Sequence, residues 1–243
     1  MAEARNGTLE ALRREVPIGF VPFAGEGRRV GLVIVDEVNG FCTVGAGNLA
    51  PRAENAQVSG MVAETDRLAR AFAERDLPIF AFLDTHQPGK PEPPYPPHCE
   101  RGTGEENLVP DLAWLEHAPQ ATLCRKDCIN GFVGAIEPSG ENRVVGWVNG
   151  HGLEAILVTG ICTDVCVMDF VLTMLSARNH GLMPGLRDIG VAAKACATYD
   201  LPGAVAASFG LPPTAAHPQA LTHYMGLYFM AARGAVLHDT VAL

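Results

Sequence analysis

The sequence predicts an α/β fold: a single-domain, three-layer α/β/α sandwich with a mostly parallel central sheet of about six strands. Three short apolar runs, at residues 30–35, 78–83 and 155–160, have the length and composition of buried parallel strands. Segments with helical spacing of apolar residues lie between them. Strands that alternate with helices in this way form a parallel sheet with helices on both faces.

Further elements complete this alternation. Helices are expected where apolar residues recur with a helical period, and weaker strands where short apolar runs remain. The expected helices cover 56–75, 112–115, 142–149, the run that follows Asp164 to about residue 179, and 218–232; the expected strands cover 121–124, 189–191 and 235–237. Residues 196–200 are expected to form a turn.

A chain of 243 residues is long enough for one large domain with a substantial core. No repeat, low-complexity tract or linker divides it, so we expect one domain over residues 30–243. Residues 1–29 are expected to be an N-terminal extension, with a short amphipathic helix at 9–14 and a lead-in loop at 16–29.

The composition limits the class of protein. With 48% hydrophobic and 19% charged residues, the chain is expected to be globular. A net charge of −9 argues against a nucleic-acid partner and an anionic membrane. The chain contains no run of 18 apolar residues, and its N-terminus lacks the apolar stretch of a signal peptide. Seven scattered cysteines fit a reducing compartment, so we expect a cytoplasmic protein, with the nucleus as a second location.

The stretch 155–170 carries the strongest chemical signal. A buried strand is followed by a short polar turn and then by a helix, for which Thr163 and Asp164 are expected to provide the cap. Cys166 would lie in the first helical turn, where the helix dipole favours a thiolate and lowers the pKa. Cys166 is therefore a candidate nucleophile. Two other interpretations stay open: a cysteine that only fills space in the core, and a thiolate pair with Cys162 that binds a metal.

Polar residues also follow the other predicted strands. Asp36, Asp84 and Lys126 each come at the end of an apolar run, as Cys166 does. Because the carboxyl ends of parallel strands share one edge of the sheet, we expect these side chains to lie together. An acid, an amine and a thiol at one edge favour nucleophilic catalysis. The alternatives are an Asp36 that only caps a loop and a Lys126 that is a solvated surface charge.

A possible metal site lies on the same edge. Asp84 and His86 are two residues apart, so on an extended chain they leave from the same face. His98 follows a proline-rich loop that contains Glu92. Carboxylate and imidazole ligands suit Zn²⁺, Mn²⁺ or Fe²⁺, and three protein ligands leave open positions, as in a catalytic site. The alternative is that these side chains only form loop hydrogen bonds.

Five motifs carry a resemblance to a known family. They are IVDEVNGFC, LDTHQP, YPPHC, CRKDCINGF and VTGICTDVCV, in this order along the chain. In this combination the sequence resembles the isochorismatase-like cysteine hydrolases, and among them the nicotinamidases of the plant-type branch. The resemblance extends from about residue 30 to about residue 202 and implies the isochorismatase-like α/β fold.

The resemblance implies a role for each motif residue. Cys166 would be the nucleophile, Asp36 its proton acceptor and later proton donor, and Lys126 the third member of the catalytic set. The peptide bond between Ile161 and Cys162 would be cis. The N–H groups of Cys162 and Cys166 would then form an oxyanion hole.

The resemblance also implies one divalent metal ion, zinc in the first place and manganese or iron as alternatives, held by Asp84, His86 and His98. Bacterial relatives use a further histidine in the loop, which is absent from the corresponding stretch here. Glu92 is the candidate to replace it, directly or through a water. Phe41 and Tyr95 would be aromatic walls for a pyridine ring, although the family often has tryptophan at the second position.

Together with the site residues, the resemblance implies a metal-dependent amidohydrolase that converts nicotinamide to nicotinate and ammonia through a cysteine thioester, a step of NAD salvage. The expected partners are this small-molecule substrate and further copies of the chain in a homo-oligomer, with no nucleic acid and no membrane. The alternative function is a related cysteine amidase that acts on another small amide, such as an N-carbamoyl compound, biuret or a pyrazinamide-like compound. A third hypothesis is a non-catalytic binding protein that keeps the fold.

Overall fold

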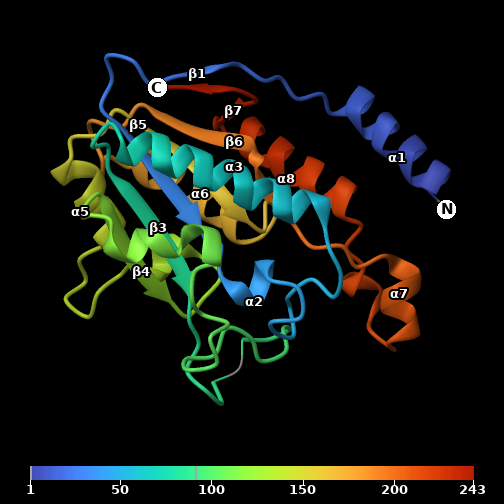
Figure 1. Cartoon of the computed structure of the whole chain (residues 1–243). Helices are drawn as coiled ribbons and strands as arrows, with labels where there is room; N and C mark the ends of the chain where they lie inside the picture. The colour runs from blue at the N-terminus through green and yellow to red at the C-terminus, as the bar shows by residue number, and fades with distance from the viewer. Residues whose placement is uncertain (1, 91) are drawn as a thin grey trace.

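The computed structural model describes residues 2–90 and 92–243, and one six-stranded sheet runs through its centre (Figure 1). The strands are all parallel and lie in the order β4-β3-β2-β5-β6-β7. Their bounds are β2 Val30–Val35, β3 Ile79–Asp84, β4 Ala121–Lys126, β5 Ala155–Ile161, β6 Asp188–Ala197 and β7 Val236–His238. A separate parallel pair joins β1 (Phe23–Ala24) to β8 (Val241–Ala242). The predicted parallel sheet is therefore confirmed.

Helices cover both faces of the sheet, as the three-layer prediction requires (Figure 1). The face with Leu32 and Ile34 packs against α3 and the 3₁₀ helix η1, and the face with Val33 and Val35 packs against α5, α6 and α8. The helices are α1 Ala2–Glu15, α2 Asn39–Cys42, α3 Ala56–Ala73, η1 Pro110–His117, α4 Gly131–Gly134, α5 Arg143–Gly150, α6 Cys166–Asn179, α7 Gly203–Ser208, η2 Pro213–Ala215 and α8 Gln219–Ala232.

The central strands are continuous apolar runs because both of their faces are covered. Every residue of β2, β3 and β5 is buried. Successive side chains point to opposite faces of a strand, so each run supplies both cores at once. Burying a large aliphatic side chain contributes about 1.5–3 kcal/mol, so each of these strands stabilises both layers of the core.

The order of the strands reverses direction between β2 and β5. The chain leaves β2 toward β3 on one side and leaves β5 toward β6 on the other. In open parallel sheets, ligands bind outside the carboxyl ends of the strands at this kind of reversal. The two strands approach closely here. Gly160 has a φ of 126°, and a Cβ at this position would lie 2.1 Å from the Val35 carbonyl oxygen. Only glycine satisfies both conditions.

The N-terminal and C-terminal segments lie against each other. α1 is longer than the predicted helix at 9–14. Directly after α1, the Val16 carbonyl oxygen accepts a hydrogen bond from the Tyr224 hydroxyl at 2.9 Å. Arg13 lies over the ring of Tyr224 at 5.9 Å. β1 lies in the segment that was expected to be a loop. A two-residue strand has no sequence signature of its own, because its pairing with β8 defines it.

The prediction was wrong for the end of β6. This strand continues to Ala197, so Cys196 and Ala197 lie in the sheet and not in a turn. Cys196 pairs with Gly160, and Ala197 pairs with Ile161, after an irregularity in the register of β5 and β6. The longer strand matters because it carries Thr198 to the carboxyl edge of the sheet, beside the turn that follows β5.

Candidate active site

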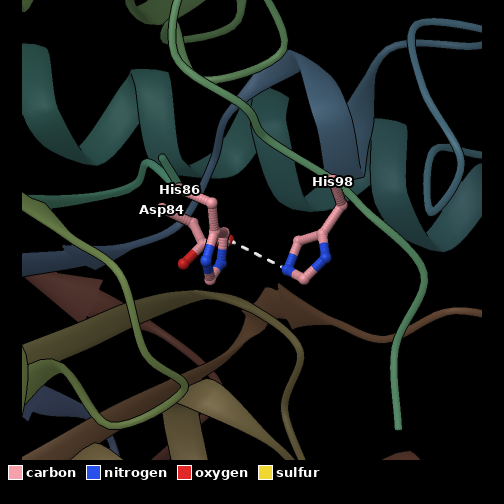
Figure 2. A group of neighbouring side chains, drawn as sticks. All are labelled: Asp84, His86 and His98. Carbon is pink, nitrogen blue, oxygen red and sulfur yellow. Dashed lines mark hydrogen bonds and ion pairs between the residues drawn. The ribbon is translucent and has the colours of Figure 1, made fainter. Parts of the chain in front are cut away.

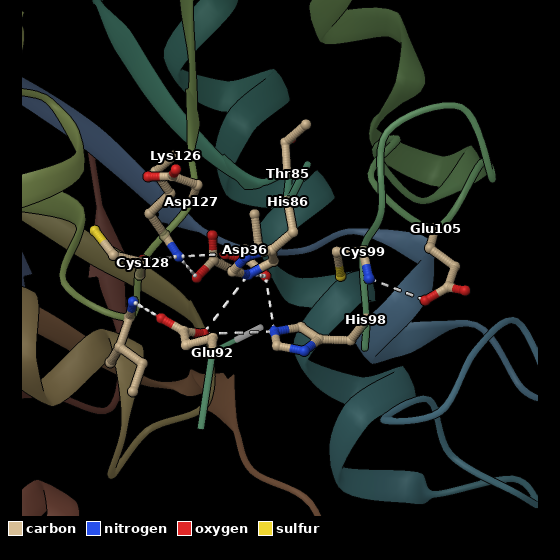
Figure 3. Close-up of polar contacts among 12 residues, drawn as sticks. Asp36, Thr85, His86, Glu92, His98, Cys99, Glu105, Lys126, Asp127 and Cys128 are labelled. Carbon is tan, nitrogen blue, oxygen red and sulfur yellow. Dashed lines mark hydrogen bonds and ion pairs between the residues drawn. The ribbon is translucent and has the colours of Figure 1, made fainter. Parts of the chain in front are cut away.

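A buried lysine joins the predicted residues at the edge of the sheet (Figure 3). Lys126 is the last residue of β4, and its Nζ lies 2.8 Å from Asp36 Oδ2 and 3.0 Å from Asp84 Oδ1. It also donates a hydrogen bond to the Cys128 carbonyl oxygen at 2.9 Å. The two aspartates raise the pKa of Lys126 well above its usual value, although burial alone acts to lower it. The ammonium group therefore stays charged between two carboxyl groups.

Asp36 has an unusual backbone and an unusual acidity. It directly follows β2 with a φ of 56°, in the left-handed region that few residues other than glycine occupy. Its N–H donates to the Phe82 carbonyl oxygen at 3.1 Å. Burial raises the pKa of Asp36 to about 6, while the charge of Lys126 and a hydrogen bond from Cys166 act in the opposite direction. A carboxyl group with this pKa can accept and release a proton near neutral pH.

Cys166 is the first residue of α6 and is buried. Its N–H belongs to the first turn of the helix, where amide groups have no acceptor within the helix. The expectation of a thiol with a lowered pKa was wrong. Burial raises the pKa of Cys166 well above its usual value, although the charge of Lys126 acts to lower it. The loss of hydration outweighs the helix dipole, so the neutral thiol needs a base. Asp36 is the candidate, because it follows the neighbouring strand β2 and Cys166 acts on its pKa.

The turn between β5 and α6 has the backbone geometry that the resemblance implies. The peptide bond between Ile161 and Cys162 is cis. The N–H of Thr163 donates to the Ala197 carbonyl oxygen at 2.8 Å, which ties the turn to β6. Burial raises the pKa of the Cys162 thiol to about 12. Within the described residues, the group of three converging ligand atoms consists of Asp84, His86 and His98 and includes neither cysteine, so the interpretation of Cys162 and Cys166 as a metal-binding pair receives no support.

Asp84, His86 and His98 converge on one point (Figure 2). Asp84 Oδ2 lies 3.0 Å from His86 Nε2 and 3.2 Å from His98 Nε2, and the potential ligand atoms all lie within 4.8 Å of one another. His98 donates from Nδ1 to the Pro96 carbonyl oxygen at 2.8 Å, so in the neutral ring the lone pair is on Nε2, the nitrogen that faces Asp84. Despite its burial, Asp84 has a pKa well below its usual range because Lys126 and the two histidines favour the charged form. The donor set fits a zinc-type divalent ion.

Glu92 faces the same space from the proline-rich loop (Figure 3). Its Oε2 lies 3.6 Å from the Nε2 atoms of both His86 and His98. Its Oε1 accepts a hydrogen bond from the N–H of Ile129 at 3.0 Å, which orients the carboxylate. Glu92 is thus placed to reach a metal ion or a water bound to it.

Two aromatic side chains border this cluster. The ring centroid of Phe41 lies 5.6 Å from that of His98, and the ring centroid of Tyr95 lies 6.2 Å from it. Both rings were expected to flank a planar substrate, and both lie beside the histidine whose Nε2 points toward Asp84. A flat heteroaromatic ring could be held between them.

Sequence reasoning missed a second polar cluster, which lies next to the turn between β5 and α6. Asp164 was expected to cap α6, but Val165 occupies the cap position and no side chain caps the helix. The Asp164 carboxylate instead contacts Thr198 and His217, which lie 34 and 53 residues further along the chain. No local pattern could have indicated these partners, because the contacts exist only in the folded chain.

The comparison with known proteins decides the family. Residues 30–222 match the Isochorismatase domain family. The chain belongs to the isochorismatase family. It is 55% identical over 229 residues to Nicotinamidase 1 from Arabidopsis thaliana, with 93% of both chains covered. The family resemblance predicted from the five motifs is therefore confirmed.

Solved structures with the same fold include other members of the family. The nicotinamidase PncA from Bacillus subtilis superimposes with a TM-score of 0.64 at 19% identity, covering 87% of this chain and 99% of that one. A pyrazinamidase from Pyrococcus horikoshii in complex with zinc superimposes with a TM-score of 0.59 at 19% identity, covering 86% and 98%. At these identities the similarity supports the isochorismatase-like fold. In the described part of the chain, no helix has both the length and the apolar content needed to cross a bilayer.

Proposed function

We propose that this chain is a nicotinamidase that hydrolyses nicotinamide to nicotinate and ammonia. The observation that carries the proposal is the position of Lys126 between Asp36 and Asp84, because it joins a thiol with its base to a metal-type cluster in one site. The identity of 55% to a plant nicotinamidase over 93% of the chain supports the same substrate. We assign residues 30–243 to the hydrolase domain and residues 1–29 to an extension.

The first half of the reaction forms a thioester. Asp36 accepts the proton of Cys166, and the sulfur attacks the amide carbon. Lys126 stays protonated and offsets the negative charge that passes from carboxylate to thiolate. The carbonyl oxygen becomes an oxyanion that the N–H groups of Cys162 and Cys166 stabilise, and a donor in this kind of site contributes about 3–4 kcal/mol. The C–N bond then breaks, and the amine takes the proton from Asp36 to leave as ammonia.

The second half regenerates the enzyme. A water gives a proton to Asp36 while its oxygen attacks the thioester carbon, and the same two N–H groups hold the oxyanion. The C–S bond breaks, nicotinate is released, and the sulfur recovers a proton from Asp36. One amide bond and one water are consumed for one carboxylate and one ammonium ion. A carboxyl group whose pKa lies near 6 can serve in both halves.

Asp84, His86 and His98 would hold a divalent metal ion, with Glu92 as a further ligand or as the partner of a bound water. Such an ion supplies a Lewis acid for the ring nitrogen of the substrate and so orients the ring. Phe41 and Tyr95 would flank that ring. Zinc is our first choice because two imidazoles and a carboxylate are typical of catalytic zinc sites, with manganese or iron as alternatives. We further propose a homo-oligomer in the cytoplasm or nucleus.

Ammonia release by the purified protein tests the proposal. Nicotinamide, pyrazinamide, an N-carbamoyl compound and biuret would be compared by kcat/KM, with zinc, manganese or ferrous ion supplied. We expect nicotinamide to have the highest kcat/KM. Absence of ammonia release from nicotinamide by the folded, metal-supplied protein would contradict the proposed function. A higher kcat/KM for an amide without a pyridine ring would favour the alternative amidase.

A further inference from the structure

The turn at residues 162–165, here called the oxyanion turn, lies between the two amide groups that would stabilise the oxyanion. It connects β5 to α6 and has contacts on two sides. The end of β6 lies on one side, and residues 217–226 of the C-terminal segment lie on the other. Because the turn is short and irregular, its own backbone does not fix its position. The contacts around it must do so.

Asp164 is the main anchor of the oxyanion turn. Its Oδ1 accepts a hydrogen bond from the Thr198 hydroxyl at 2.6 Å, and its Oδ2 lies 2.7 Å from His217 Nε2. Both carboxylate oxygens are thus bound by partners from outside the turn. Burial alone would raise the pKa of Asp164, but the hydrogen bonds from His217 and Thr198 and the interaction with His217 lower it. The carboxylate is therefore charged and makes strong hydrogen bonds.

The partners of Asp164 are themselves held in place. His217 donates from Nδ1 to the Tyr199 carbonyl oxygen at 2.9 Å, and its ring stacks on that of Tyr199 with centroids 3.7 Å apart. The backbone of His217 also forms a bridge with Leu201 through two hydrogen bonds. These contacts fix the imidazole in one orientation, so Asp164 meets a rigid partner.

Thr198 holds Asp164 against the end of β6. Its hydroxyl donates to Asp164 Oδ1 at 2.6 Å. Its N–H donates to Gln57 Oε1 at 3.1 Å, and its carbonyl oxygen accepts from Gln219 Nε2 at 2.6 Å. The side chain is buried with no exposed area. The Thr198 hydroxyl therefore ties the oxyanion turn to a residue that is itself held by two further partners.

α8 closes the other side of the turn. His223 Nδ1 forms a hydrogen bond with the Thr163 hydroxyl at 2.8 Å. Gly226 approaches so closely that a Cβ there would lie 2.8 Å from the Cα of Asp164. A helix that touches the backbone of the turn restricts its movement directly.

We propose that Asp164, held by Thr198 and His217, is a positioning residue that aims the N–H groups of Cys162 and Cys166 at the oxyanion. The inference rests on the proposed function. Within the turn, the N–H groups of Val165 and Val167 donate to the Cys162 carbonyl oxygen at 3.0 and 3.1 Å, so a shift of Asp164 moves both donors. Displacement of a catalytic group by about 1 Å can lower a rate about 100-fold.

A matched pair of variants tests this role. Thr198→Val removes the hydroxyl with almost no change of volume, and Thr198→Ser keeps the hydroxyl. We expect Thr198→Val to lower kcat for nicotinamide about 10- to 100-fold with little change in KM, and Thr198→Ser to stay near wild type. His217→Gln should lower kcat about 10-fold. His238→Gln is a control, because His238 is also buried and bonded to a carbonyl oxygen, that of Val21, but lies away from the turn.

Inhibition by pyridine-3-carboxaldehyde separates positioning from a general loss of structure. The Cys166 sulfur adds to the aldehyde carbon while its proton passes to Asp36, and the aldehyde oxygen becomes an oxyanion like that of the reaction. Nicotinate binds without forming such an oxyanion. Thr198→Val should weaken aldehyde binding by the same factor as kcat and leave nicotinate binding unchanged. Equal kcat in Thr198→Val and Thr198→Ser, or equal losses of aldehyde and nicotinate binding, would overturn the positioning role. Absence of ammonia release by the wild-type protein would instead contradict the proposed function.

Discussion

Two clusters in this chain are built from the same residue types, one aspartate and two histidines, but they differ in where the ring nitrogens point. In the first cluster, the Nε2 atoms of His86 and His98 both face one oxygen of Asp84, at 3.0 and 3.2 Å. The other oxygen of Asp84 is bound by Lys126. Ligand atoms of three residues thus lie within 4.8 Å of one another, as a metal site requires.

In the second cluster, only His217 faces the aspartate, Asp164. His223 bonds to the hydroxyl of Thr163, and the second nitrogen of His217 is bound by the Tyr199 carbonyl oxygen. Within the described residues, no group of three ligand atoms converges here as it does at Asp84. Every polar atom named here has a partner from the chain itself.

The difference shows that the direction of the lone pairs, and not the residue types, separates a site for an external ligand from an internal anchor. The first cluster brings ligand atoms of three residues together around one oxygen of Asp84. The second uses its ligand atoms to hold the oxyanion turn against β6 and α8. We therefore expect the two clusters to respond differently to the same substitutions.

Substitution of the nucleophile should have the largest effect on turnover and none on the first cluster. Cys166→Ala removes the sulfur that forms the thioester, so we expect ammonia release to fall by about 10⁴-fold or more. The metal content per chain should be unchanged, because no ligand is altered. Ammonia release and metal analysis of the purified variant check both statements. Near-wild-type turnover would show that Cys166 is not the nucleophile.

Metal binding should distinguish the two aspartates. Asp84→Ala should weaken zinc binding by more than about 100-fold, since the loss of groups that merely support metal ligands costs 10- to 100-fold. Asp164→Ala should leave zinc affinity unchanged. Calorimetric titration of both metal-depleted variants measures the contrast. His86→Gln removes a proposed zinc ligand and leaves both partners of Lys126 in place, so it serves as a second test. If His86→Gln still binds zinc tightly, the first cluster is not the zinc site.

Zinc should also stabilise the fold through the first cluster only. At a free zinc concentration 100 times the dissociation constant, the free energy of unfolding should rise by about 2.7 kcal/mol. The increase should disappear in His98→Ala and persist in His217→Gln. Urea unfolding of metal-depleted protein with and without zinc measures it. Equal stabilisation of both variants would mean that zinc binds elsewhere.

The second cluster should make stability depend on pH. Burial lowers the pKa of His223 from 6.5 to about 4, so the unfolded chain binds this proton more readily than the folded chain. The contribution of neutral His223 is present above pH 6.5 and is lost as the pH falls toward 4. Between pH 7 and pH 5, the wild type should lose about 1–2 kcal/mol more stability than His223→Gln. Identical pH profiles would contradict a buried, neutral His223.

The sequence was sufficient for the parts of the fold that repeat a simple physical pattern. The strands β2, β3 and β5 are continuous apolar runs, and each is buried along its whole length. The end of β6 was missed because residues 192–195, Ala-Ala-Lys-Ala, favour helices by composition. Pairing with β5 overrides that preference.

For the candidate site, strand ends were enough to bring Asp36, Asp84 and Lys126 together, because parallel strands share one edge. The acidity of Cys166 was not predictable in this way. The helix dipole is visible in the sequence, whereas the complete burial that raises the pKa is a property of the folded site. The anchors of Asp164 were missed for the same reason.

Lys126 also makes the two halves of the site thermodynamically dependent on each other. Its single ammonium group forms ion pairs with both Asp36 and Asp84, so it balances part of the negative charge of each carboxylate. The negative charge of Asp84 raises the pKa of Asp36, so a cation held by Asp84 would offset that charge and favour the ionised form of Asp36. By reciprocity, loss of the proton from Asp36 changes the affinity of the cluster for that cation by the same factor. Neither the nucleophile nor the metal site can therefore be retuned alone.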